Sequence, residues 1–184
     1  MARRNPRLPA IIAVLASVGC SQTPAPPTAP TAPSAATRPA TTRSAAIDSF
    51  QGEYRFLSNF WPAEVVFEGA TYPTAEHAYQ AAKSLDPVER QRIAASPTPA
   101  DAKRAGRALK PRDDWETAKF DVMERVVRDK FTRHADLRRQ LLATGDAELI
   151  EGNTWGDRVW GVYQGEGENH LGRILMRLRA ELRK

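Results

Sequence analysis

The feature that most restricts the folding of this chain is a long run of proline, alanine, threonine and serine at residues 21–46. Few large apolar side chains occur there, so burial cannot repay the backbone entropy that ordering would cost. We therefore expect a disordered tether of partly polyproline character. Aromatic, glycine and charged residues arrive together from Phe50 onward. The sequence thus predicts one compact domain over residues 47–184, preceded by this tether.

The segment before the tether, residues 1–20, has the layout of an export signal. Arginine occupies three of the first seven positions, and an apolar run covers residues 8–18. A run of this length is too short to span a bilayer and is typical of a signal peptide. Ser17-Val18-Gly19-Cys20 resembles a bacterial lipobox, although Ser17 stands where leucine is usual, so Cys20 is predicted to carry a lipid in the cell envelope. The alternative is a misassigned start codon ahead of a cytoplasmic enzyme.

Composition narrows the classes of ligand. The chain has 184 residues and a formal net charge of +5, which favours anionic partners, with phosphate-bearing small molecules placed ahead of nucleic acid. A single cysteine excludes an intrachain disulfide, and one cysteine with three histidines disfavours a Cys/His zinc site. No metal site is therefore predicted.

The folded part is predicted to be an α+β domain, mainly α. β-branched and aromatic residues at 63–67, a Glu68-Gly69 turn and Thr71-Tyr72 indicate a short N-terminal β-hairpin. Thr74 and Thr98-Pro99 are typical helix starts. Apolar periodicity predicts helices from residue 74 to before residue 87, over 98–109, over 115–134, around 137–142 and over 171–178, with a strand at 147–151.

Two polar segments near the hairpin are candidates for chemistry. Glu76 and Lys83 fall on one face of the first predicted helix. The Glu76 carboxylate could activate water, whereas Lys83 taken alone could simply be a solvated surface residue. The preceding loop LSNFWP combines the amide of Asn59 with the ring of Phe60, which suits recognition of a planar heterocycle. His77 has no triad partner in the sequence and is interpreted as structural.

The segment EGNTWGDRVWGVYQGEGEN carries Asp157 and two tryptophans among glycines, without the periodicity of a core element. This pattern favours a binding or catalytic loop. The alternative is that Trp155 and Trp160 only cover the end of the domain. Trp115, at the start of the longest predicted helix, is equally open to a packing role.

The blocks LSNFWP, YPTAEHAYQAAK, DWETAKFDVMERVVRDKF, LLATGDAELIEGNTWGDRVWG and GENHLGRILMRLRAEL, in this order, resemble the YbiA family of the NADAR superfamily. The resemblance covers essentially the whole domain after Phe50. It implies a single compact, mainly helical domain that acts as an N-glycosidase on phosphorylated ribosylamine intermediates of riboflavin biosynthesis. Relatives remove ADP-ribose from modified guanine in nucleic acid. No metal or organic cofactor is implied.

The resemblance also assigns site residues. Glu76 matches the family glutamate, and Asp157 with Trp160 matches its aspartate and tryptophan, so Glu76 and Asp157 are the expected catalytic pair. The expected substrate-binding residues are Asn59, Phe60, Lys83, Trp115, Trp160 and Asn169. Gly156 stands where the family pattern has asparagine, and an export-like leader is foreign to a cytoplasmic role in riboflavin metabolism.

The residue types agree with this chemistry. Cleavage of a ribosyl C–N bond passes through an oxocarbenium-like transition state that calls for carboxylates and a positioned water. We expect Glu76 to orient or deprotonate the water and Asp157 to stabilise the ribose, with the reverse assignment left open. The expected substrate is a phosphoribosyl or ADP-ribosyl molecule, and membrane contact is expected only through Cys20. A non-catalytic, membrane-tethered sensor of ADP-ribose or nucleotides, or an exported effector, are the competing hypotheses.

Overall fold

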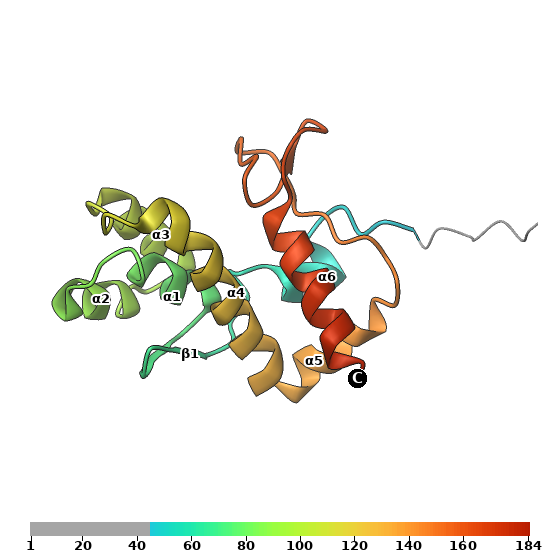
Figure 1. The fold of residues 1–184 in the computed structure, drawn as a ribbon, viewed down its shortest axis with the longest axis horizontal. Helices are drawn as coiled ribbons and strands as arrows, with labels where there is room; N and C mark the ends of the chain where they lie inside the picture. The colour runs from blue at the N-terminus through green and yellow to red at the C-terminus, as the bar shows by residue number, and fades with distance from the viewer. Residues whose placement is uncertain (1–44) are drawn as a thin grey trace, which may run out of the picture. The chain divides into compact units, whose positions relative to one another are not determined.

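A computed structural model describes residues 45–184 (Figure 1). The predicted signal-like segment, its Cys20 and the tether lie outside the described residues. The elements follow the order η1 (Gly52–Leu57), β1 (Val65–Phe67), β2 (Ala70–Tyr72), α1 (Ala75–Ala81), α2 (Pro87–Ala94), α3 (Pro99–Ala108), α4 (Trp115–Arg133), α5 (Ala135–Ala143), β3 (Gly152–Asn153), β4 (Val162–Tyr163) and α6 (His170–Leu182). Within residues 45–184, no helix combines the length and apolarity needed to cross a bilayer. The predicted α+β, mainly α fold class is confirmed.

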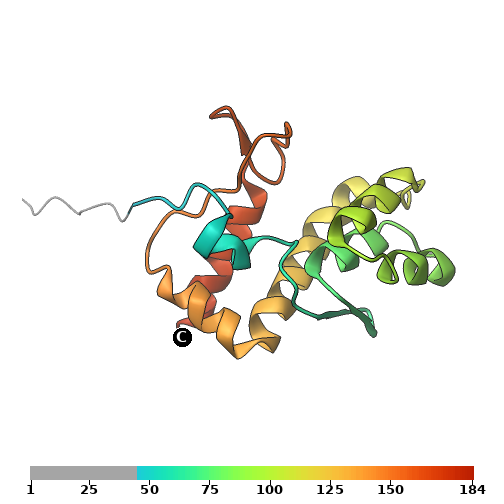
Figure 2. The same ribbon diagram turned by 180° about the vertical axis from the view of Figure 1, so that it is seen from behind.

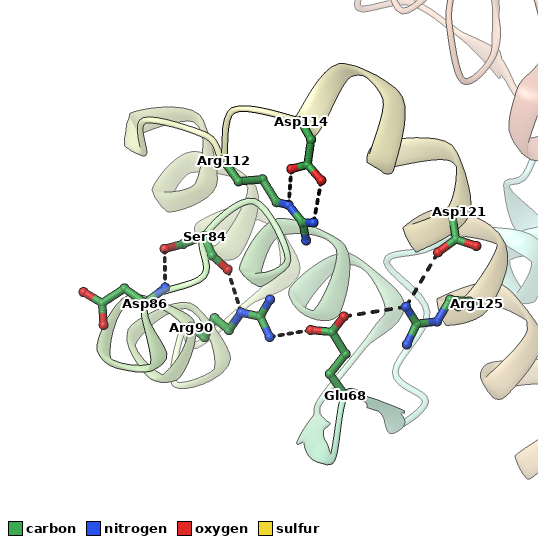
Figure 3. Close-up of polar contacts among 8 residues, drawn as sticks. All are labelled: Glu68, Ser84, Asp86, Arg90, Arg112, Asp114, Asp121 and Arg125. Atoms are coloured by element: carbon green, nitrogen blue, oxygen red, sulfur yellow. Dashed lines mark hydrogen bonds and ion pairs between the residues drawn. The ribbon is translucent and has the colours of Figure 1, made fainter.

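The predicted hairpin forms, with Val65 opposite Tyr72 in an antiparallel ladder. Its loop is Glu68-Gly69, and both residues have positive φ, at 49° and 81°. Two positive φ values suit the type I′ turn, whose twist matches that of the flanking strands. The Glu68 carboxylate then binds Arg90 of α2 at 2.6 Å and Arg125 of α4 at 3.6 Å (Figure 3). The tip of the hairpin is thereby tied to two helices.

The start signals of α1 and α3 act as the sequence predicts. The hydroxyl of Thr74 accepts a hydrogen bond from the His77 backbone N–H, and that of Thr98 accepts one from Asp101. The His77 ring also bridges the Thr74 hydroxyl and the Ser96 carbonyl, at 2.8 and 3.1 Å. Burial lowers the pKa of His77, which favours the neutral ring, and Nε2 is the donor to Ser96 because a carbonyl can only accept. The structural interpretation of His77 fits these contacts.

Helix α4 connects the two sides of the domain. It packs against α1 and β1 along one part of its length and against α5 and α6 along another. In Figure 1 it runs diagonally from the α1–α3 group to α5 and α6, and Figure 2 shows the same arrangement from behind. Its buried face includes Val122, Met123, Val126 and Phe131. The apolar periodicity that predicts this helix therefore marks its core face.

Two local expectations need correction. Helix α1 ends before residue 87 as predicted, but it already ends at Ala81, so Lys83 lies beyond the helix on which it was expected. A separate helix begins at Pro87, where Asp86 accepts a hydrogen bond from the Val88 N–H and proline suits the first helical turn. The strand expected at 147–151 is only a single parallel bridge between Ile47 and Leu149. The short parallel pair of β3 and β4 lies farther along, so most of the segment 151–169 is loop at the N-terminal end of α6 (Figures 1 and 2).

Lys130, on the core face of α4, has a fully buried side chain. Its Nζ donates to the carbonyls of Phe56 and Ser58, at 2.6 and 2.8 Å. Burial lowers the pKa of Lys130 to about 7. The two hydrogen bonds join α4 to the end of η1, from which the loop carrying Asn59 and Phe60 continues.

We predict that Lys130→Met destabilises the domain. The variant keeps the apolar stem but leaves the Phe56 carbonyl without a donor and the Ser58 carbonyl with only the Trp61 N–H, and an unsatisfied buried group costs about 1–3 kcal/mol. The free energy of unfolding in urea should fall by roughly 2 kcal/mol or more. Lys110→Met, at an exposed lysine, is the matched control and should change it by less than about 0.5 kcal/mol. Equal stability of the two variants would contradict this role.

Candidate active site

One cleft of about 1060 Å³ opens between the loop after η1, helices α1 and α3, and the segment 151–160. Six of the eight residues predicted to act in catalysis or substrate binding line it: Asn59, Phe60, Glu76, Lys83, Asp157 and Trp160. These residues come from parts of the chain that are distant in sequence. The fold therefore brings most of the predicted residues together.

Glu76 is held in the first turn of α1 and is buried, with 6% of its surface exposed. Its backbone N–H donates to the Asn59 carbonyl at 3.1 Å, and its Oε1 accepts from Gln80 Nε2 at 2.8 Å. Burial raises the pKa of Glu76, while the Gln80 hydrogen bond and the positive charges of Lys103, Lys83 and Arg107 oppose that rise. Glu76 is thus a desolvated carboxyl surrounded by groups that favour its ionised form.

Two buried amide oxygens in this wall have no hydrogen-bond partner within residues 45–184: Asn59 Oδ1 and Gln80 Oε1. Asn59 Nδ2 donates to the sulfur of Met123 at 3.2 Å. Gln80 Oε1 faces Gly106 of α3, where a Cβ would overlap it. Glycine at 106 therefore permits the close approach of α3 that encloses Glu76.

Asp157 lies in the loop before β4 and is partly buried. Its Oδ1 accepts hydrogen bonds from the N–H groups of Val159 and Trp160, at 3.0 and 2.8 Å. The Asn153 side chain bonds both the N–H and the carbonyl of Asp157. Asp157 therefore shapes the turn that delivers Trp160, in addition to facing the cleft.

Glu151 is a cleft residue that the sequence argument missed, because it was assigned to the end of a strand. Burial, together with the negative charges of Asp157 and Glu76, raises the pKa of Glu151 to about 8, and Lys103 opposes the rise. No periodic signal marks this residue. Only the clustering of acidic residues around the Gly/Trp-rich segment could have indicated it.

Asn169 does not line the cleft, in contrast to its predicted binding role. It is buried at the start of α6, where its Oδ1 accepts from the Glu151 N–H at 3.1 Å and its Nδ2 donates to the Leu149 carbonyl at 2.9 Å. Its φ of 53° is left-handed, a conformation that asparagine tolerates better than most residues. The side chain thus positions Glu151 from behind.

Trp115 also lies behind the cleft, since it is buried and absent from the lining. Its ring packs 5.2 Å from that of Tyr79, and Tyr79 packs 5.5 Å from Trp160, both measured between ring centroids. Phe120 supports Trp160 from another side, also at 5.5 Å. Of the two roles considered for Trp115, these contacts favour packing, because its ring supports Tyr79, which in turn packs on Trp160, and both of those residues line the cleft.

Positive charge is concentrated in the cleft, whose lining includes the cations Arg55, Lys83, Lys103, Arg104 and Arg107. The Lys103 ammonium lies 5.7 Å from the ring centre of Phe60 and 5.6 Å from that of Trp155. Trp155 is 55% exposed, although a large apolar ring is usually covered. Burial lowers the pKa of Lys83, whose Nζ donates to the Gly106 carbonyl at 3.3 Å. Carboxylates, cations and aromatic rings therefore share one enclosure.

Such a set of side chains on a mainly helical domain fits a hydrolase of glycosidic bonds. Residues 48–183 match the NADAR domain family, so the chain belongs to it. N-glycosidase YbiA of Escherichia coli (strain K12) is 45% identical over 139 residues, covering 73% of this chain and 85% of that protein. The NMR structure of E. coli YbiA matches with a TM-score of 0.69 and 40% identity, over 77% of this chain and 86% of that chain. The predicted family and the N-glycosidase class are confirmed.

The relatives differ in how much of their own length matches this chain. A riboflavin biosynthesis protein of Vibrio vulnificus is 40% identical over 132 residues, which cover 70% of this chain but 36% of that protein. An N-glycosidase of Nostoc punctiforme is 40% identical over 136 residues, covering 71% of this chain and 86% of that protein. The domain thus occurs both nearly alone and as a part of longer relatives.

We predict that the two hydrogen bonds of the Asn169 side chain stabilise the domain. Asn169→Gly keeps access to the left-handed conformation, removes these bonds and adds the entropy cost of a glycine, so it should lower the free energy of unfolding by about 1–3 kcal/mol. Asn169→Ala should lose about 1 kcal/mol more, because alanine disfavours that conformation. Denaturant unfolding of both variants measures the difference. A glycine variant as stable as the parent chain would show that the bonds contribute nothing.

Proposed function

We propose that the domain hydrolyses the N-glycosidic bond between a phosphorylated ribose and a base, with a ribosylamino-pyrimidine intermediate of riboflavin biosynthesis as the substrate type. The observation that carries the proposal is that Glu76, Glu151 and Asp157 line one cleft with aromatic rings and cations. Carboxylates serve an oxocarbenium-like transition state, rings stack on a base, and cations bind phosphate. The name of the V. vulnificus relative supports the substrate type.

In this proposal Glu76 is the group that orients and deprotonates the attacking water. It is the most enclosed of the cleft carboxyls, and three cations and the Gln80 amide favour its ionised form. Asp157 stabilises the positive charge that develops on the ribose, through the carboxylate oxygen that does not cap its own turn. Trp160 stacks on the base, while Lys83 or Lys103 binds phosphate.

A second candidate substrate is ADP-ribosylated guanine in nucleic acid. It is favoured by the exposed Trp155 ring beside Lys103, since an exposed aromatic ring next to a cation suits an unpaired base and its backbone. A non-catalytic nucleotide-binding module is less favoured. The carboxylates in the cleft would repel the phosphate groups of a nucleotide, and a protein that only binds the nucleotide gains nothing from them. A lipid anchor at Cys20 stays a separate prediction.

The proposal is tested by incubating purified protein with a panel of ribosylated substrates and measuring free base and free ADP-ribose by liquid chromatography and mass spectrometry. The panel contains a ribosylamino-pyrimidine 5′-phosphate, its dephosphorylated form and DNA that carries ADP-ribosylguanine. We expect release of the pyrimidine, with loss of efficiency when the phosphate is removed. Release of free ADP-ribose from the DNA alone would assign the second candidate, and no release from any substrate would contradict both.

We predict that Glu76→Gln lowers turnover by roughly a hundredfold or more while the fold is kept, because the amide cannot take a proton from water. Asp157→Asn should also lower turnover, since its amide oxygen can still cap the turn but carries no charge. Steady-state kinetics measure both effects. Glu64→Gln, an exposed glutamate outside the cleft, is the matched control and should leave turnover unchanged. Full activity of Glu76→Gln would exclude the water-activating role.

Trp160→Ala tests the binding role separately. Stacking of an aromatic ring on a base contributes about 1–3 kcal/mol, so we predict a rise in KM of roughly tenfold or more with a smaller change in kcat. Removal of the ring also disturbs its packing on Tyr79 and Phe120, so circular dichroism must first show a folded variant. A fall in kcat with unchanged KM would instead assign Trp160 to the chemical step.

A further inference from the structure

The backbone of Glu151 is fixed on both sides although its segment is loop. Its N–H donates to the Asn169 side chain at 3.1 Å, and its carbonyl accepts from the Val162 N–H at 2.9 Å. Gly161 approaches that carbonyl so closely that a Cβ there would overlap it. The backbone position from which the Glu151 side chain lines the cleft is therefore fixed. Catalytic side chains need a fixed backbone of this kind, because catalysis depends on their exact position relative to the reacting atoms.

The charges around Glu151 differ from those around Glu76. Glu76 faces the cations Lys103, Lys83 and Arg107 and accepts a hydrogen bond from Gln80. Glu151 faces the carboxyls of Asp157 and Glu76, with Lys103 as the cation that acts on it. Neighbouring negative charge favours the protonated acid, and neighbouring positive charge favours the carboxylate. Burial raises the pKa of both glutamates, but neighbouring carboxyls add to the rise at Glu151, whereas cations and the Gln80 amide oppose it at Glu76. This difference favours the acid role at Glu151 and the base role at Glu76.

We propose that Glu151 is a third catalytic residue, the general acid that protonates the departing base. This inference rests on the proposed N-glycosidase function. As the C1′–N bond breaks, its electron pair passes to the base nitrogen, which takes the proton from the Glu151 carboxyl. Water then forms the new C1′–O bond and gives its proton to the Glu76 carboxylate. The products are the free base and the free sugar, and a proton returned from Glu76 through solvent to Glu151 restores the starting state.

The first test compares two leaving groups. A ribosylamino-pyrimidine needs a proton to depart, whereas a ribosyl pyridinium, such as nicotinamide riboside, releases a neutral base without one. Glu151→Gln should lower kcat on the first substrate by roughly a hundredfold and change it little on the second. Glu76→Gln should impair both, because both need activated water. Glu148→Gln, an exposed glutamate on the same segment, should impair neither. Equal loss on both substrates in Glu151→Gln would overturn the assignment.

The second test is the pH profile on the pyrimidine substrate. A general acid works only while protonated, so wild-type kcat should fall as the pH rises through about 8, and this alkaline limb should vanish in Glu151→Gln. Glu151→Asp should keep the limb, at reduced activity, because it retains an acid. A limb that persists unchanged in Glu151→Gln would overturn the assignment.

A third measurement does not depend on activity. The pKa of Glu151 is raised from 4.5 to about 8 on folding, so the folded state binds more protons between these values. The stability that this group contributes is present below pH 4.5 and is lost as the pH rises through 8. The unfolding free energy of the wild type should therefore decline over this range more than that of Glu151→Gln. Parallel curves for a wild type that cleaves a riboside would overturn the acid role alone. A wild type inactive on every riboside would contradict the proposed function, and with it the acid role, even if the curves differed as predicted.

Discussion

Electrostatic repulsion among carboxyl groups confined in one cleft is the constraint on which this site depends. Glu76, Glu151 and Asp157 share one cleft, and burial there makes the charge of the two glutamates cost more than it would at the surface. The domain offsets this with cations on α3 and at the end of α1, and with the amide of Gln80. A site built for binding alone would have no use for this arrangement.

The scaffold places its strongest polar contacts behind the cleft. Lys130 joins the long helix α4 to the end of η1, and Asn169 joins the start of α6 to the segment that carries Glu151. Tyr79 and Phe120 hold the Trp160 ring, and Trp115 holds Tyr79. Each of these residues acts through a residue that faces the cleft. Their side chains are accordingly buried or partly buried rather than exposed to a ligand.

Much of this fold could be predicted from local signals. Thr74 and the Thr98-Pro99 pair carry their own capping chemistry, and Glu68-Gly69 specifies a hairpin turn, so each element follows from nearby residues. The periodicity of α4 likewise reports its buried face. The family resemblance located Glu76 and Asp157, and the cleft contains both. Their catalytic roles stay predictions.

What could not be predicted depends on tertiary contacts. Trp115 and Asn169 carry the residue types of a binding site, yet burial and hydrogen bonds to the backbone place them behind it. Glu151 resembled the end of a strand, and only the approach of Asp157 and Glu76 gives it an unusual environment. No pattern in one stretch of sequence encodes the proximity of residues from separate segments.

The most direct test of the account is a crystal structure of the protein with ribose 5-phosphate, the sugar product of the proposed reaction. The account predicts that the anomeric carbon lies among Glu76, Glu151 and Asp157, with the glutamate carboxyls within the roughly 10 Å that a shared glycosidic centre can bridge. The phosphate should contact the cations of α3, and the Trp160 ring should face the space left by the base. A sugar bound outside this cleft, or an anomeric carbon turned away from all three carboxyl groups, would contradict it.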